Sequence, residues 1–244
     1  MRRRYPLTII GLIAAGCGPS PTAPAGCSDD GRPVAGRHCV EGLDVPVLSP
    51  HAAEIDSILT ITLKEAEALL PLGAIRVRLF TDPAGTIPEI GVGGFTPSAE
   101  EIRLWIDAAR ADTTEIVSEW LRLVLLHELH HAARTGTVGY GGTVFAAVVS
   151  EGLADHFAVE VTGKAPPPWA VALTGQELAD WVAAVLAAPS GAYSHPRWFF
   201  GTDTSVPRWA GYAVGFELIR VALAASPGAT AAGWADAEAS QFRP

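Results

Sequence analysis

One short stretch of the chain, Leu126-His127-Glu128-Leu129-His130-His131, restricts the possible folds more than any other. It lies in an apolar run that extends from about Ile116 to Gly136, so we expect it to be part of a buried helix. His127 and His131 are four residues apart and therefore lie one above the other on one helix face. Two histidines and a glutamate would be costly in an apolar core if nothing paired with them. The spacing predicts that one metal ion binds both histidines.

The stretch contains the H-E-x-x-H motif that binds zinc in many hydrolases. In such a helix the two histidines bind zinc, and the glutamate takes a proton from a water molecule on the metal. These roles would fall to His127, His131 and Glu128. The motif alone is moderately specific, and a catalytic zinc needs a third protein ligand and an open fourth position. No His-x-x-Gly-x-x-His continuation follows, so the metzincin arrangement is excluded.

The next carboxylates along the chain are Glu151 and Asp155. Glu151 lies 20 positions after His131, on a second predicted helix that runs from about Thr143 to Val161. Asp155 follows one helical turn later and faces the same way. These two residues are therefore the nearest candidates to complete the site.

The order His127-Glu128-x-x-His131 and then Glu151-x-x-x-Asp155 resembles the gluzincin pattern of thermolysin-type and aminopeptidase-type metallopeptidases. The resemblance implies that Glu151 is the third ligand of a single Zn²⁺ ion. It also implies that Asp155 hydrogen-bonds a ligand histidine and fixes its tautomer. The expected substrate is a peptide or protein.

Four longer segments more closely resemble a predicted zinc-dependent protease family that was long filed as a domain of unknown function. They are His127–Arg134, Ser150–Phe157, Trp198–Gly201 and Pro207–Tyr212, and the resemblance covers roughly residues 50–225. It supports the catalytic class but says little about the substrate. Both endopeptidase and aminopeptidase-like cleavage therefore remain open.

A zinc peptidase usually has a further hydrogen-bond donor for the oxyanion of the tetrahedral intermediate. Tyr212, in the last of the four segments, is our candidate, and His195 and Tyr193 are the next choices. A buried core aromatic with a satisfied hydroxyl is an equally good interpretation of Tyr212. We interpret the neighbouring His130 and His156 as packing or supporting residues.

Hydrophobic periodicity predicts an α+β fold that is zincin-like and helix-rich, with a small sheet upstream of the active-site helix. Alternating strands are expected near residues 75–80 and 102–107, and residues 81–98 and 189–207 resemble loops. One strand could form the edge of the cleft, where an extended peptide would bind by backbone hydrogen bonds. Helices are expected from Ser49-Pro50 to Gly73, from Asp112 with a capping box to Gly136, over 143–161, from Thr174 and from about Arg208.

The N-terminus resembles an export signal. Three arginines precede a short apolar run and the small residues before Cys17, so we expect residues 1–16 to be removed. The sequence before Cys17 resembles a lipoprotein cleavage site, although Ala14 stands where leucine is commonest. A lipidated Cys17 would anchor the protein in a bacterial cell envelope, on the periplasmic or outer surface. Simple cleavage would give a secreted protein.

Residues 17–48 are expected to form a lead-in that contains a Pro-rich tether, and residues 49–244 the peptidase domain. Cys27 and Cys39 would form a disulfide in an exported protein. The formal net charge of −9 and the absence of a basic cluster beyond the first four residues argue against nucleic-acid binding. The oligomeric state is left open.

Two other functions compete with hydrolysis. A di-iron carboxylate protein uses Glu-x-x-His, which Glu128 and His131 supply once, but the core helices contain no second copy. The other alternative is a non-catalytic, zinc-containing binding lipoprotein that keeps the fold as a scaffold. All residues that the chemistry requires are present, which favours the enzyme.

Overall fold

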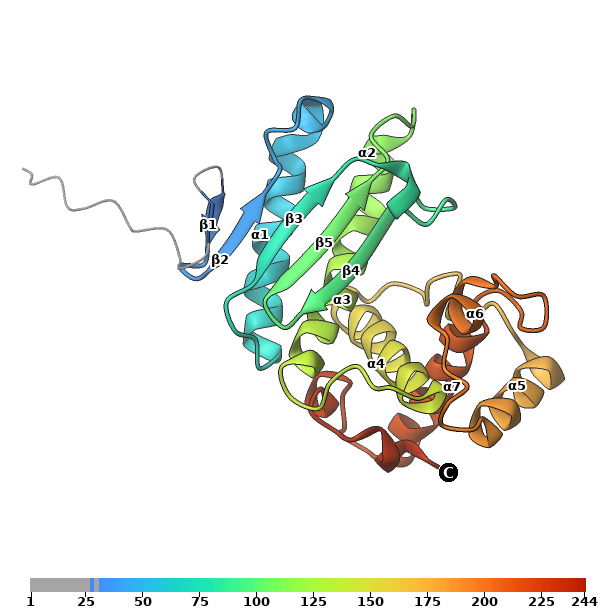
Figure 1. Cartoon of the computed structure of the whole chain (residues 1–244). Helices are drawn as coiled ribbons and strands as arrows, with labels where there is room; N and C mark the ends of the chain where they lie inside the picture. Colours follow the sequence, from blue (N-terminus) through green and yellow to red (C-terminus); the bar gives the residue numbers. More distant parts are fainter. Residues whose placement is uncertain (1–26, 29–30) are drawn as a thin grey trace, which may run out of the picture.

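The structure is a computed structural model that describes residues 27–28 and 31–244. The predicted signal peptide, Cys17 and the Pro-rich tether that follows it lie outside the described residues. The fold is α+β, as predicted, with a small sheet followed by a helix-rich half (Figure 1). A disulfide joins Cys27 to Cys39 with a Cα–Cα distance of 5.5 Å, and this bond ties the lead-in to the sheet.

The sheet has the strand order β1-β2-β3-β5-β4. The β2–β3 and β3–β5 pairs are parallel, whereas β1–β2 and β4–β5 are antiparallel, so β4 is an edge strand. The expected strands are β3 and β5, whereas β1, β2 and β4 are additional. The bounds are Arg32–Val34 for β1, His38–Glu41 for β2, Arg76–Phe80 for β3, Val92–Ser98 for β4 and Glu101–Ile106 for β5.

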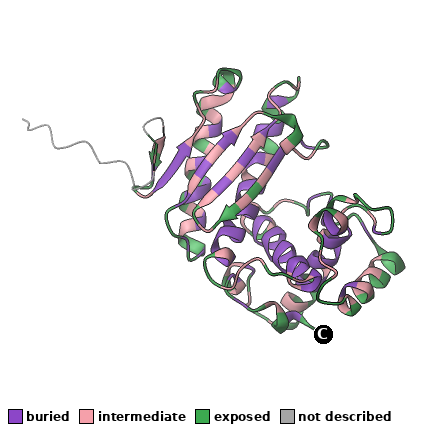
Figure 2. Ribbon diagram, in the orientation of Figure 1, coloured by how far each residue is buried: buried purple, intermediate pink, exposed green. Residues whose placement is uncertain are grey.

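Helices α1 (Ala52–Leu69) and α3 (Arg122–Thr135) pack on one face of the sheet, behind it in Figure 1. Figure 2 shows alternating buried and less buried residues along the central strands, as expected for a sheet with one covered face. The expected start of α1 at Ser49-Pro50 is wrong, because Pro50 lies inside a preceding 3-10 helix, Pro46–His51. Helix α3 also contacts the edge strand β4, which places this strand beside the H-E-x-x-H motif.

The helix expected over 112–136 is present but is not uniform. It consists of α2 (Thr113–Ile116), a π-helical segment (Val117–Leu121) and α3. The predicted capping box at Asp112 is wrong. Its carboxylate makes no cap hydrogen bond and instead accepts two bonds from the guanidinium of Arg110, 2.9 and 2.8 Å long.

The helix-rich half is built on α4 (Val144–Thr162) and α7 (Ala210–Ala225), and α5 (Gly175–Ala187) and α6 (His195–Phe200) complete it. Helices α4 and α7 meet at Gly152 and Gly215, where a Cβ on Gly152 would lie 2.2 Å from the Gly215 carbonyl oxygen. Such close packing fixes the part of α4 that carries Glu151. Within the described part of the chain, no helix has both the length and the apolar character that are needed to cross a membrane.

Candidate metal site

Two packed helices bring the predicted ligand side chains together. Helix α3 carries His127 and His131, α4 carries Glu151, and all three residues are buried. Nε2 of His127 lies 3.0 Å from Nε2 of His131 and 3.0 Å from Oε2 of Glu151. One ligand atom from each residue lies within 4.8 Å of the other two, so the three atoms can hold one metal ion.

Electrostatics make this cluster suitable for a cation. Burial lowers the pKa of His127, but Asp155 and Glu151 outweigh burial and raise that pKa well above its ordinary value. Burial raises the pKa of Glu151, but His131 and His127 outweigh it and hold that pKa well below its ordinary value. The carboxylate of Glu151 is therefore ionised. A buried negative charge is stabilised by a positive charge beside it, here between this carboxylate and the histidine rings. A divalent metal can supply that charge in place of a proton, and two histidines with one glutamate form a donor set that fits zinc.

Asp155 lies directly behind His127. Its Oδ1 atom accepts a hydrogen bond from Nδ1–H of His127 at 2.8 Å and another from the indole N–H of Trp169 at 3.0 Å. A proton on Nδ1 leaves the lone pair on Nε2 free for a metal. The sequence analysis gave no sign that Trp169 holds Asp155.

Tyr140 is a site residue that the sequence analysis missed. Its hydroxyl donates a 2.5 Å hydrogen bond to Oε1 of Glu151, and its ring packs against the edge of His131 with 5.4 Å between centroids. Burial raises the pKa of Tyr140 well above its ordinary value, so the phenol keeps its proton. Tyr140 lies in the glycine-rich connection between α3 and α4, where only the three-dimensional fold shows which side chain turns inward.

Glu128 lies beside the cluster, against the edge strand β4. The hydroxyl of Thr96 donates to Oε2 of Glu128 at 2.6 Å, and burial raises the pKa of this carboxyl. A Cβ on Gly94 would lie 2.5 Å from Oε1 of Glu128 and 2.6 Å from its Cγ. The strand therefore leaves room for Glu128 at Gly94 and fixes its orientation through Thr96.

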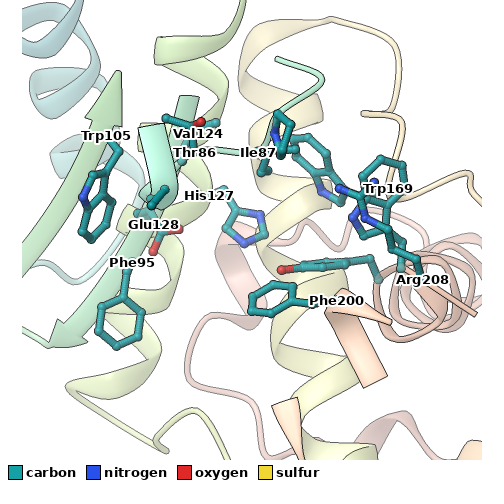
Figure 3. Close-up of a pocket in the computed structure, with 17 residues that line it drawn as sticks. Thr86, Ile87, Phe95, Trp105, Val124, His127, Glu128, Trp169, Phe200 and Arg208 are labelled. Atoms are coloured by element: carbon teal, nitrogen blue, oxygen red, sulfur yellow. The ribbon is translucent and has the colours of Figure 1, made fainter. Parts of the chain in front are cut away.

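Two cavities of about 450 Å³ each meet at the site. Both reach His127, Glu128 and Tyr212, so these residues lie where the cavities join. The metal-side cavity is also lined by His131, Tyr140, Glu151, Tyr193 and His195. The aromatic cavity is also lined by Ile87, Trp105, Val124, Trp169 and Trp209, and Figure 3 shows several of these side chains around His127.

The three candidate oxyanion donors differ in what they contact. Among the described residues, the hydroxyl of Tyr212 has no hydrogen-bond partner, and its ring packs on Phe199 with 4.9 Å between centroids. The hydroxyls of Tyr193 and Tyr140 each lie 3.2 Å from Nδ1 of His195. Tyr212 is therefore the candidate with a free hydroxyl at the junction of the two cavities.

His130 and His156, which we interpreted as packing or supporting residues, each contact a backbone carbonyl oxygen in the core. Nε2 of His130 lies 3.2 Å from the carbonyl oxygen of Ala231, and Nε2 of His156 lies 2.9 Å from that of Phe216. Both rings are buried and also pack on phenylalanines. These contacts account for both residues without metal binding.

Arg134, one of the residues in the family-like segments, is buried with a relative exposure of 2%. Its guanidinium donates to the carbonyl oxygens of Trp234, Ala235 and Ala237, at 3.4, 3.2 and 3.0 Å, and to Ser150 at 3.2 Å. Desolvation by burial lowers its pKa to about 10. Arg134 therefore attaches the C-terminal tail to the helix that carries the motif.

Comparison with known proteins places these residues within one family. No curated protein and no solved structure matches the chain. A family model described as "Predicted Zn-dependent protease (DUF2268)" matches residues 55–243, which include the motif, Glu151, Asp155 and the tail that Arg134 binds. The chain therefore belongs to this family of predicted zinc-dependent proteases.

Proposed function

We propose that the protein is a zinc metallopeptidase that hydrolyses peptide bonds. The observation that carries the proposal is that ligand atoms of His127, His131 and Glu151 converge on one point. Glu128 lies beside this point. The open side of this point faces two cavities, which leaves room for water and substrate. Asp155 supports the arrangement because it holds His127 in the tautomer that metal binding requires.

The residues divide the chemistry among themselves. Zinc held by His127, His131 and Glu151 would polarise the peptide carbonyl and lower the pKa of a bound water to about 7. Glu128 takes a proton from the attacking water and later gives it to the leaving amine. Its raised pKa suits this exchange, and Thr96 keeps its carboxylate in position. The hydroxyl of Tyr212 donates to the oxygen on which negative charge develops.

The edge strand β4 gives an extended peptide a place to bind. Gly94, Phe95 and Thr96 line the metal-side cavity, and Gly94 and Phe95 also line the aromatic cavity. A peptide could therefore lie along β4 and add to the sheet by backbone hydrogen bonds. This position brings its backbone past Glu128, which the strand already contacts.

Paired variants test the proposal. Glu128→Gln should keep zinc at about one ion per chain but lose peptide hydrolysis, whereas Glu151→Ala should bind zinc much more weakly. Zinc content is measured by elemental analysis, and hydrolysis by digestion of a peptide library with a chelator control. Full activity of Glu128→Gln would refute the mechanism. Zinc binding without any hydrolysis in the wild type would favour the non-catalytic binding protein, and two irons per chain would favour the di-iron alternative.

We also propose that the protein is exported and anchored to the bacterial cell envelope through a lipid on Cys17. The support is the N-terminal sequence alone. A Cys17→Ser variant should lose labelling with a radioactive fatty acid and move to the soluble fraction. Equal labelling of this variant and the wild type would refute lipidation at Cys17.

A further inference from the structure

The aromatic cavity begins at the reacting centre and extends away from the metal ligands. Val124 lies one helical turn before His127 on α3, so the helix that binds the metal also forms a wall of this cavity. Trp169, which holds Asp155, forms another wall. Figure 3 shows Ile87, Trp169 and Arg208 on the far side of His127 from Trp105. A group placed in this cavity would therefore adjoin the bond that is hydrolysed.

Trp209 reaches this cavity from an unfavourable backbone conformation. Its φ angle is +70°, and among the described residues only one other non-glycine residue, Ala35, has a positive φ. Such a conformation is costly for a bulky residue and persists where the surroundings enforce it. Here the N–H of Trp209 donates to the carbonyl oxygen of Phe199 at 3.1 Å. The segment between Gly201 and Arg208 folds back closely on itself, since a Cβ on Gly201 would lie 2.8 Å from Cα of Arg208.

An ion pair neutralises the charge at the same wall. The guanidinium of Arg208 lies 4.1 Å from the centroid of the Trp209 ring and donates to both carboxylate oxygens of Glu89, at 2.5 and 3.0 Å. This pair connects the loop before β4 to the start of α7. Glu128, at the other end of the cavity, accepts a hydrogen bond from the hydroxyl of Thr96. A charged side chain that entered the cavity would lose its hydration, and at this wall it would find Arg208 and Glu89 already paired with each other.

The geometry points to a specificity subsite. We propose that the aromatic cavity takes a large aliphatic or aromatic side chain from the substrate residue next to the scissile bond, and that Trp209 determines how well that side chain fits. The proposal rests on the proposed peptidase function. It gives that function a substrate class, which is peptides with a residue such as leucine or phenylalanine beside the cleaved bond. The cavity volume of about 450 Å³ lies within the range of small-ligand pockets.

Binding to a non-cleaving protein tests the subsite separately from catalysis. Zinc-loaded Glu128→Gln would be titrated with a set of fluorescent peptides that are identical except at one position. That position holds Ala, Leu, Phe, Asp or Lys. We expect Leu and Phe peptides to bind at least about tenfold more tightly than the Ala peptide, and Asp and Lys peptides no better than Ala. The wild-type enzyme should show the same order in kcat/KM, with cleavage beside the varied position as determined by mass spectrometry.

Two further variants test whether residues that line the aromatic cavity select the substrate side chain. Trp209→Gly can keep the positive φ without strain and should reduce the Phe-to-Ala ratio of affinities to about threefold or less. Ile87→Trp should fill the cavity and reduce the same ratio, which keeps the test valid if Trp209→Gly folds poorly. Trp181→Ala is the matched control, because Trp181 packs on Trp198 from α5 and does not line the cavity. It should leave the ratio unchanged.

The outcomes separate the two proposals. If Ala and Phe peptides bind equally, or if neither cavity variant changes their ratio, the subsite is refuted, and Glu128-dependent hydrolysis by the wild type would still support the peptidase. If the wild type hydrolyses no peptide but the affinity ratio depends on Trp209, the peptidase is refuted and the cavity remains a binding site for apolar side chains.

Discussion

The two oxygens of Glu151 have different partners. Tyr140 donates to Oε1 at 2.5 Å, whereas Oε2 lies 3.0 Å from Nε2 of His127 and 3.3 Å from Nε2 of His131. One oxygen is thus held by the protein and the other is directed toward the histidines. This division lets Glu151 offer a single oxygen to a metal and leaves space for a water molecule.

The first prediction concerns Tyr140. Tyr140→Phe should weaken zinc binding by about 10- to 100-fold, because Glu151 loses the bond that fixes its orientation. Competition with a chromophoric chelator measures the affinity. Tyr193→Phe is the control, since Tyr193 contacts His195 but makes no hydrogen bond to Glu151. Equal zinc affinities of Tyr140→Phe and the wild type would show that this hydrogen bond does not position the ligand.

The second prediction concerns Gly94. In Gly94→Ala the new Cβ would collide with Glu128, so this carboxylate must move. We expect kcat to fall by at least about 100-fold while zinc affinity changes little, because a small misplacement of a catalytic group is costly. Gly73→Ala is the control, since a Cβ there meets no atom within 4 Å. Normal kcat in Gly94→Ala would contradict the role of Glu128 as the base.

The third prediction concerns the attachment of the tail. Arg134→Met should lower the free energy of unfolding by about 3 kcal/mol, because three carbonyl oxygens lose their buried donor. Thermal unfolding measures the loss, and limited proteolysis should show earlier cleavage after residue 226. Arg220→Met is the control, because the exposed pair of Arg220 and Glu217 contributes little. A loss of stability no larger than in this control would refute the role of Arg134.

The fourth prediction concerns pH. Burial lowers the pKa of His130 well below its ordinary value of 6.5, so the folded protein keeps this ring neutral. Below pH 6.5 the unfolded chain binds a proton that the folded protein does not, and stability therefore falls as pH falls. The contribution approaches roughly 1.4 kcal/mol per pH unit for one proton.

His130→Gln tests this pH effect, because glutamine can donate to Ala231 but does not titrate in this range. Denaturant unfolding of the metal-free protein at pH 7, 6 and 5 gives the free energies. The decrease in the free energy of unfolding between pH 7 and pH 5 should be smaller in the variant than in the wild type. Equal slopes would show that His130 takes up a proton without unfolding.

The sequence predicted the helices of the site well because their periodic apolar residues and the H-E-x-x-H spacing are local signals. It identified neither Tyr140 nor Thr96, which reach the site from a loop and a strand and lie 11 and 32 residues from their partners in sequence. Strand β4 was interpreted as a loop because Gly93, Gly94 and Pro97 conceal its alternation. Gly94 would itself have been a signal, since a strand glycine often marks a close approach.

The two short strands at the start had no signal of their own, since three or four residues are too few to show a period. The cap predicted at Asp112 failed for a different reason. Arg110, two residues away, binds that carboxylate and removes it from the helix end. In both cases the outcome depends on a competing partner or a neighbouring strand, which a local pattern does not contain.

The contacts of Arg134 have a consequence for the order of folding. Its guanidinium and the ring of His130 find their carbonyl partners about 100 residues later in the chain. The segment that forms the motif helix therefore precedes, by most of the domain, the groups that satisfy its buried polar side chains. The helix can reach its final packing only when the tail arrives. A chain that stopped before Ala231 would thus contain the complete motif, but the helix that carries it would lack the carbonyl partners of His130 and Arg134.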